Sequence, residues 1–302
     1  MGENNIRDMN ITRKINWINS KDPKNLHLMN GLEKDLQAFY SLNPDYYSNI
    51  NFTEGNWIDE EQKGYQAIIA AANSSVSICE VGCGSANILN HYPHFISKYS
   101  GCDFSDVLMQ KNCTAYSGAT FTAIQQPNLL PFEDEQFDLV FSTFVLEHST
   151  NPSLFLSECS RILKLGGTLI ILCPDFLAKG RLTSQRSGFG AGTTSQKIKQ
   201  GKYFDALVTL WDNRIRIPLV CKSYQQKANK EPSFFINLNP TLFQDTFIPD
   251  VDAVYVTYKN EIINELSNSF TVKKNSSDLS DYENKHQLIF IAFTKELSTI
   301  IS

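Results

Sequence analysis

The sequence of 302 residues lacks any apolar run near the length of about 20 residues that a helix needs to span a bilayer. Its longest apolar runs, at 168–173 and 288–293, have the length of strands. The N-terminal 16 residues are polar and carry charges of both signs, so they lack the apolar centre of a secretory signal. We therefore expect a cytoplasmic protein with no membrane partner.

Cysteine pairs of the C-x-x-C type are also absent. The seven cysteines are an odd number, and four lie in or beside runs that predict buried strands. His27, His91, His94 and His286 show no metal-ligand spacing. These patterns predict reduced thiols, no disulfide framework and no bound metal.

An excess of positive charge is missing as well. The chain has 27 Lys and Arg against 32 Asp and Glu, which gives a net charge of -5. Binding to nucleic acid requires a basic face that neutralises phosphates, so nucleic acid is not an expected partner.

Short strand-like runs alternate with amphipathic stretches between residues 76 and 173, which is the pattern of a parallel sheet with crossover helices. Strands are predicted at 76–81, 99–102, 120–125, 137–142 and 167–173, and helices at 87–97, 106–116 and 153–163. Pro152 is expected to open the last helix and Gly166-Gly167 to close it.

The whole chain divides into four predicted parts. Residues 1–74 form an N-terminal helical cap, 75–175 a ligand-binding core, 176–250 an insertion that serves as a lid, and 251–302 the completion of the core sheet. The cap has helices near 28–39 and 60–72, and the lid has one at 196–211. The last part has a helix near 260–268 and two strands, from 270 and at 287–294, that pair as an antiparallel edge. The predicted fold class is α/β, a Rossmann-like doubly wound sheet that is mostly parallel, with that antiparallel C-terminal edge.

A strand, a small-residue turn and the start of a helix follow one another at 78–87. Gly82 and Gly84 allow a tight turn and admit a ligand, because a Cβ there would occupy the ligand's space. A dinucleotide site has a third glycine where this sequence has Asn87. Glu80, at the end of the strand, would repel a diphosphate and attract an ammonium or sulfonium group. The turn therefore favours a cationic nucleoside.

Asp103 ends the second predicted strand, 19 residues after Gly84. Its carboxylate is placed to accept hydrogen bonds from a ribose diol. The alternative is a capping or turn aspartate, since Asp103 to Asp106 is also typical of a helix start.

Five motifs occur in order between about residues 76 and 175: Glu80-Val81-Gly82-Cys83-Gly84, Gly101 to Ser105, Leu130 to Val140, Leu146-Glu147-His148 and Arg161 to Gly167. Together they resemble the class I S-adenosylmethionine-dependent methyltransferases, specifically the methyltransferase type 11 group. The resemblance implies S-adenosylmethionine as the cofactor and S-adenosylhomocysteine as the product.

The resemblance also implies roles for individual residues. Asp103 would hold the ribose hydroxyls, with Phe104 stacked near the adenine. Gln126 stands where the family often has an acidic residue for the adenine amino group. The next residue is a proline, which cannot donate, so Asn128 or Leu129 would supply the donor. Ala86 replaces the third family glycine and adds only a methyl. On the methionyl side the resemblance implies contacts from Glu80, Gly82, Cys83, Gly84, Ala86, Thr143 and Phe144.

His148 is the candidate catalytic residue, because imidazole titrates near neutrality and this residue follows the fourth strand. The alternative is that it anchors its loop by hydrogen bonding. The acceptor pocket is expected between the cap and the lid, with walls from Tyr46, Tyr47, Tyr203, Phe204 and Trp211.

The sequence thus predicts a methyltransferase acting on a small molecule, with O- or N-methylation favoured over C-methylation. Two alternatives stay open: an NAD-dependent oxidoreductase and a non-catalytic methyltransferase-like binding protein.

Overall fold

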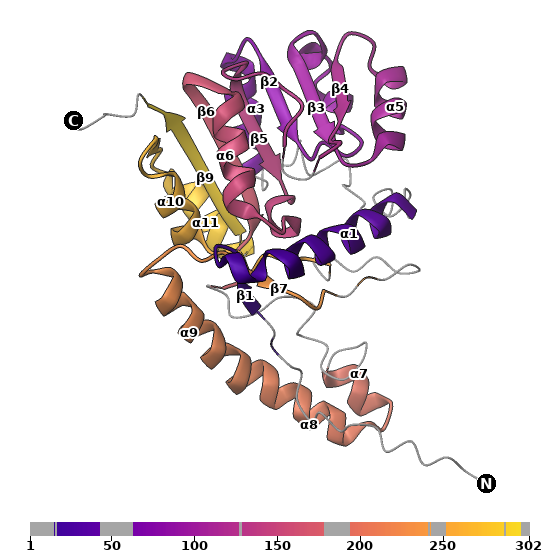
Figure 1. Ribbon diagram of the computed structural model, residues 1–302, viewed down its shortest axis with the longest axis vertical. Coiled ribbons are helices and arrows are strands. Elements are labelled where there is room, and N and C mark those ends of the chain that lie inside the picture. Colours follow the sequence, from indigo (N-terminus) through magenta and orange to yellow (C-terminus); the bar gives the residue numbers. More distant parts are fainter. Residues whose placement is uncertain are drawn as a thin grey trace.

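The computed structural model describes residues 15, 17–42, 63–126, 129–177, 194–240, 242, 252–286 and 288–296. At its centre is a seven-stranded sheet with the order β4-β3-β2-β5-β6-β9-β8 (Figure 1). Its strands are β2 (Ile78–Val81), β3 (Tyr99–Asp103), β4 (Thr120–Ala123), β5 (Phe137–Thr143), β6 (Leu163–Pro174), β8 (Phe270–Val272) and β9 (Leu288–Lys295). Neighbours from β4 to β6 run parallel, whereas β9 is antiparallel to β6 and β8. The predicted α/β, Rossmann-like fold with an antiparallel C-terminal edge is confirmed.

Helices cover both faces of this sheet, as its strands require, because β2 and most of β5 and β6 are buried. One face carries α3 (Lys63–Ser74), α4 (Ile88–His91), α5 (Asp106–Ala115), α11 (Ser277–His286) and a 3-10 helix at Pro93–Lys98; the other carries α6 (Pro152–Ile162) and α10 (Lys259–Leu266). Ile68 and Phe95 belong to the core of the first face, and Leu156 and Ile262 to the core of the second.

The helix ends differ from the prediction in three places. The helix expected at 87–97 is interrupted at Tyr92, because Pro93 has no N–H and starts a 3-10 helix instead. α6 ends at Ile162, where Leu163 is already extended, so the glycine pair does not stop it. Gly166 has φ 76° inside the β6 segment. The helix expected at 196–211 is divided at Gly201, whose φ is 73°.

A further layer lies across the carboxyl ends of the parallel strands. It contains α1 (Leu26–Leu42), preceded by a 3-10 helix at Pro23–Asn25, and a small sheet in which β1 (Trp17–Asn19) pairs antiparallel with β7 (Phe235–Asn237). Residues 253–256 lie against β7, where Asn237 N donates to Val254 O at 2.7 Å. α1 crosses directly beneath the strand ends in Figure 1. The edge of the sheet where ligands bind in such folds is therefore covered by segments from both ends of the chain.

The remaining helices form an arm that extends away from the sheet (Figure 1). It consists of α7 (Thr194–Lys199), α8 (Tyr203–Trp211), a π turn at Asp212–Arg216 and α9 (Ile217–Ala228). The last three are one uninterrupted helix, in which the wide turn precedes Pro218. In the described part of the chain, no helix is both long and apolar enough to cross a membrane.

Candidate active site

The turn after β2 is built on two glycines with positive φ, 75° at Gly82 and 49° at Gly84. A Cβ on Gly84 would meet no described heavy atom within 4 Å, so the space beside it is open. A Cβ on Gly82 would instead lie 2.3 Å from Cγ2 of Val145. The expectation that a ligand requires both glycines is therefore wrong for Gly82, whose need for glycine comes from its φ and from Val145.

The backbone of this turn is held by β3. Gly82 N and Cys83 N both donate to Cys102 O, at 2.8 and 3.0 Å. Cys83 is buried and its Sγ packs 3.9 Å from the sulfur of Met109, so only its backbone faces the turn. Ala86 has φ 50°, which means that replacing glycine there adds backbone strain of about 1 kcal/mol as well as a methyl.

Asp103 points its carboxylate at the same turn. Its Oδ2 accepts from Gly84 N at 3.0 Å and its Oδ1 from Ser105 N at 3.1 Å. Burial raises the pKa of this carboxyl, and the backbone hydrogen bonds oppose the increase. The N-cap of α5 is Ser105, which accepts from Leu108 N, so Asp103 is not the helix cap. Its bond from Ser105 N, two residues on, does make it a turn aspartate, the other alternative raised by the sequence. It joins the end of β3 to the glycine turn.

Glu80 lies under the turn on β2 and is 4% exposed. The Tyr99 hydroxyl donates to its Oε2. Burial raises the pKa of Glu80 to about 8, and the nearby charge of Asp103 contributes to the increase. At neutral pH such a carboxyl stays protonated until a cation comes close enough to stabilise its charge.

The predicted adenine side is described only in part. Leu129 N donates to Gln126 O at 3.2 Å, so this N–H is engaged within its own loop. Asn128 lies outside the described residues, as do Tyr46 and Tyr47. The side chains of Leu129 and Phe104 are exposed.

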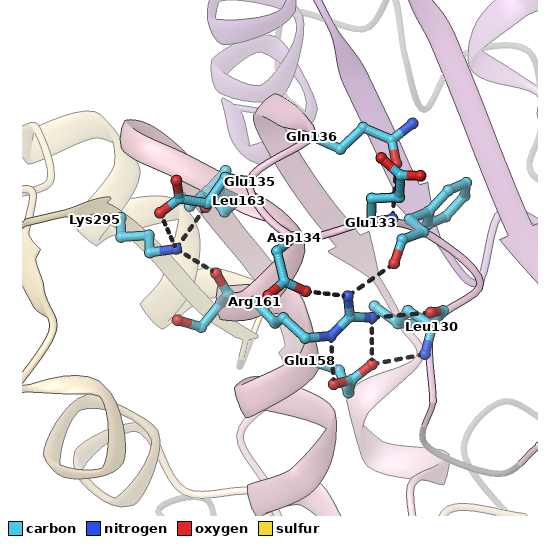
Figure 2. Close-up of polar contacts among 11 residues, drawn as sticks. Leu130, Glu133, Asp134, Glu135, Gln136, Glu158, Arg161, Leu163 and Lys295 are labelled. Carbon is cyan, nitrogen blue, oxygen red and sulfur yellow. Dashed lines mark hydrogen bonds and ion pairs between the residues drawn. The ribbon is translucent and has the colours of Figure 1, made fainter.

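Arg161 fixes the loop that continues from Leu129, as Figure 2 shows. Its Nη1 donates to Phe132 O and Asp134 Oδ1 at 2.8 Å each, and its Nη2 donates to Leu130 O at 3.0 Å and Glu158 Oε2 at 2.8 Å. Glu158 Oε2 in turn accepts from Leu130 N at 2.9 Å. Arg161 belongs to a motif recognised in the sequence, but its function of tying this loop to α6 was not predicted.

A hollow of about 720 Å³ borders the same loop. It is lined by Ser100 of β3, Thr120 and Thr122 of β4, and the loop that contains Leu129 and Leu130. Neither the glycine turn nor Asp103 lines it.

The residues after β5 lie next to the turn. Thr143 is buried and ends the strand, and Phe144 has φ 57° and donates its N–H to Leu172 O at 2.8 Å. A 3-10 helix at Leu146–His148 follows. The strained backbone at Phe144 turns the chain so that Val145 contacts Gly82.

His148 has two polar neighbours that the sequence analysis missed. Tyr40 Oη on α1 donates to Asp252 Oδ2 at 2.6 Å and lies 3.3 Å from His148 Nδ1. Asp252 Oδ2 is 3.6 Å from the same nitrogen, and Glu147 Oε1 is 4.0 Å from Nε2. No sequence signal beyond residue type could have found Tyr40 or Asp252, because they are far from His148 along the chain.

The three predicted aromatic walls that the structure describes are not at this edge. Tyr203, Phe204 and Trp211 lie on the arm, more than half exposed. The prediction that they line an enclosed pocket is wrong. Among the described residues, no group of three or more His, Cys, Asp or Glu is arranged to hold a metal ion.

In a comparison with known protein families, residues 79–171 match the model of a family described as "Methyltransferase domain". An uncharacterized protein of Methanocaldococcus jannaschii is 30% identical over 118 residues, 38% of this chain and 54% of that protein. A protein of Mycolicibacterium smegmatis, named as a probable S-adenosylmethionine-dependent methyltransferase, is 26% identical over 124 residues, 40% of this chain and 47% of that protein. The chain thus spans about half the length of these curated relatives.

Among solved structures, an S-adenosylmethionine-dependent methyltransferase from Thermotoga maritima is similar with a TM-score of 0.48 and 14% identity. The similarity covers 86% of this chain and 99% of that one.

Proposed function

Because residues 79–171 are a class I S-adenosylmethionine-dependent methyltransferase domain of the type 11 group, we propose that this chain methylates a small-molecule acceptor at the carboxyl edge of its sheet. The observation that carries the proposal is the open space beside Gly84, at a turn whose N–H is bound by the buried carboxylate of Asp103. The buried carboxyl of Glu80, close enough for its pKa to be raised by the charge of Asp103, lies on the strand before this turn. Two buried carboxyl groups would not attract an uncharged ligand and would repel an anionic one, whereas their negative charge would attract a cationic nucleoside.

The residues of the turn fit this cofactor. The Asp103 carboxylate accepts the backbone N–H groups of Gly84, Ser105 and Phe104, and its remaining acceptor capacity is available to the ribose hydroxyls. Glu80 receives the ammonium group, either directly or through water. The exposed ring of Phe104 offers a stacking surface for the adenine. The chemistry that S-adenosylmethionine supplies when bound is a methyl group activated by a positively charged sulfur.

The cover over the carboxyl edge supports a small acceptor. α1, the turn at Leu146–His148 and residues 253–256 meet there, with Val254 N and Tyr255 N donating to Glu147 O at 2.8 and 2.9 Å. Such an enclosure aligns a small acceptor and excludes water. A protein or nucleic acid acceptor would need an open approach.

We assign the proton acceptor role to His148, with Asp252 as the residue that positions it. A hydroxyl or ammonium acceptor must lose a proton. The side chain of His148 is 24% exposed, whereas the Asp252 carboxylate, 3.6 Å from its Nδ1, is buried. This supports O- or N-methylation. The competing role is structural, since Tyr40 and Asp252 also tie α1 to the 252–256 segment.

The two roles of His148 can be separated by measurement. If His148 is the base, His148→Gln lowers kcat by about 100-fold or more while cofactor affinity is unchanged. Asp252→Asn gives a smaller loss of kcat. Tyr40→Phe is the control for anchoring, because it removes the hydroxyl that bonds Asp252 and leaves both the aromatic ring and the imidazole of His148 in place. A fall in melting temperature in all three variants, with kcat unchanged, would instead establish anchoring.

The function itself is tested by supplying the purified chain with isotopically labelled S-adenosylmethionine and a metabolite extract. The expected result is transfer of the labelled methyl group to one metabolite by the wild type and not by Asp103→Ala. Calorimetry separates the alternatives. Binding of S-adenosylhomocysteine without any transfer would indicate a non-catalytic protein, and binding of NADH alone would indicate an oxidoreductase.

A further inference from the structure

Exposed apolar side chains are concentrated on the arm. Of the 17 large apolar side chains that are exposed among the described residues, eight lie between Ile198 and Leu219. They are Ile198, Tyr203, Phe204, Leu207, Leu210, Trp211, Ile215 and Leu219. Tyr203 and Leu207 are each 65% exposed and Leu219 is 64% exposed. Such a concentration of exposed apolar side chains on one segment of a folded protein indicates a binding face.

All of these side chains except Ile198, which is on α7, belong to the long helix of α8, the π turn and α9. Tyr203, Leu207, Trp211, Ile215 and Leu219 follow at steps of four residues, and each step drifts by about 40° around an α-helix. The π turn at Asp212–Arg216 widens the helix and counteracts that drift. The apolar stripe therefore continues from α8 into α9.

The opposite side of the arm is already packed. Ile217 and Cys221 are buried against Trp17, Phe176 and Phe235. The buried Lys197 on α7 pairs with Asp205 at 3.1 Å and donates to Thr209 at 3.0 Å, which fixes α7 on α8. The long helix is thus fixed to the rest of the protein by its packed side, and the exposed apolar stripe lies on its other side.

Charge on the arm is opposite in sign to that of the chain. Residues 194–230 hold eight of the 27 Lys and Arg and only two of the 32 Asp and Glu, so their net charge is +6 while the whole chain carries -5. Lys199, Lys202, Arg214 and Lys222 are exposed. Basic residues beside a stripe of Trp, Tyr, Phe and Leu are typical of helices that lie in the interface of an anionic membrane.

We propose that the face formed by α8 and α9 docks on the surface of a membrane containing anionic phospholipid. Each exposed cation near such a surface contributes attraction, and the apolar stripe enters the boundary between headgroups and acyl chains. Leu207, Leu210, Ile215 and Leu219 offer no ring on which a base could stack, so a nucleic acid fits this face poorly. Two copies joined by their arms would bring like charges together.

The absence of a membrane partner was expected from the sequence because no run could span a bilayer. A helix that lies on the surface needs no such run, because its apolar residues are spaced along one face. The present proposal therefore replaces that expectation, and it is independent of the proposed methyl transfer.

Co-sedimentation of the full chain with vesicles tests it. At low salt we expect at least tenfold tighter binding to phosphatidylcholine vesicles containing phosphatidylglycerol than to pure phosphatidylcholine, and loss of that difference at high salt. The double variant Leu207→Ser and Trp211→Ser should abolish binding. Leu154→Ser is the matched control, since that leucine is exposed on α6 outside the arm and should leave binding unchanged.

Charge is tested in the same way. Lys202→Glu with Lys222→Glu should weaken vesicle binding by about tenfold or more, whereas Lys34→Glu with Lys111→Glu, which makes the same change of net charge outside the arm, should not. Circular dichroism of each variant verifies folding.

Three results would overturn the proposal. These are no binding of the wild type to anionic vesicles at low salt, binding that survives the Leu207 and Trp211 changes, and equal binding to neutral vesicles. Sedimentation equilibrium identifies the main competitor: a dimer that the Leu207 and Trp211 changes dissociate, without vesicle binding, would assign the face to a second copy of the chain.

Discussion

Cofactor affinity should increase steeply between about pH 6 and about pH 8, because Glu80 must lose a proton before it can bind a cation. Burial raises the pKa of this carboxyl to about 8 in the ligand-free protein. When an ammonium group arrives, the ionised form is favoured and the proton is released. Below pH 8, part of the binding free energy is therefore used to deprotonate Glu80, whereas well above pH 8 Glu80 is already ionised and none is used.

The size of the effect follows from linkage. With a pKa of about 8 without ligand and one well below 6 with it, the dissociation constant should fall by about 50-fold from pH 6 to pH 8. The assay is titration calorimetry with S-adenosylhomocysteine in several buffers, which also counts the protons released. Glu80→Gln is the control, because the ligand's own amino group titrates equally in both proteins. The variant should bind more weakly at pH 8 and show little pH dependence.

Stability without ligand provides a second measurement. A carboxyl whose pKa is raised by folding stabilises the folded state below its unfolded pKa, and that contribution is lost as the pH rises through the folded pKa. Relative to Glu80→Gln, the unfolding free energy of the wild type should therefore fall by on the order of 4 kcal/mol between about pH 4.5 and about pH 8.

The two measurements separate the parts of the reasoning. If stability shows no such fall, the pKa of Glu80 is not raised. If stability falls but the affinity is independent of pH, Glu80 is buried as described and does not contact the cation. Either result would refute the assignment of Glu80 to the ligand.

Three other perturbations test the turn and its supporting loop. Gly84→Ala should weaken cofactor binding by about tenfold or more. Gly166→Ala is the control, because Gly166 also has a positive φ and open space: both variants should lose about 1 kcal/mol of stability, but Gly166→Ala should leave binding intact. Equal affinities of the two variants would show that no ligand occupies the space beside Gly84. Asp103→Ala should cost roughly 1–3 kcal/mol of binding free energy by calorimetry, and unchanged affinity would remove it from the site. Arg161→Met should lower the unfolding free energy, measured in urea, by about 1–3 kcal/mol, because Glu158 and two carbonyls lose their donor. Lys164→Met, which breaks the more exposed ion pair with Asp138, should lower it by under about 1 kcal/mol. Equal losses would contradict the loop-fixing role of Arg161.

The order of the core elements was predictable because the central strands are buried on both faces. Such strands appear in a sequence as short apolar runs, and all five predicted runs in the core are strands. Their ends were less predictable. Gly166 was expected to stop a helix, but α6 ends four residues earlier and this glycine takes a positive φ in the β6 segment. Glycine suits both places, so its presence alone did not decide between them.

The aromatic residues of the arm were misassigned for a related reason. The spacing of Tyr203, Leu207 and Trp211 shows that one side of a helix is apolar. It does not show whether another part of the chain covers that side. In the structure α8 extends from the body, and its apolar side is exposed.

The sequence by itself determined the features that depend on neighbouring residues: the succession of strands and helices, the glycine turn after β2 and the acid at the end of β3. Tertiary structure decided what depends on distant residues. The hydroxyl of Tyr40 meets Asp252 from 212 positions away and His148 from 108 positions away. No local period links such residues, because their contact exists only once α1 and the 252–256 segment are packed across the same edge of the sheet.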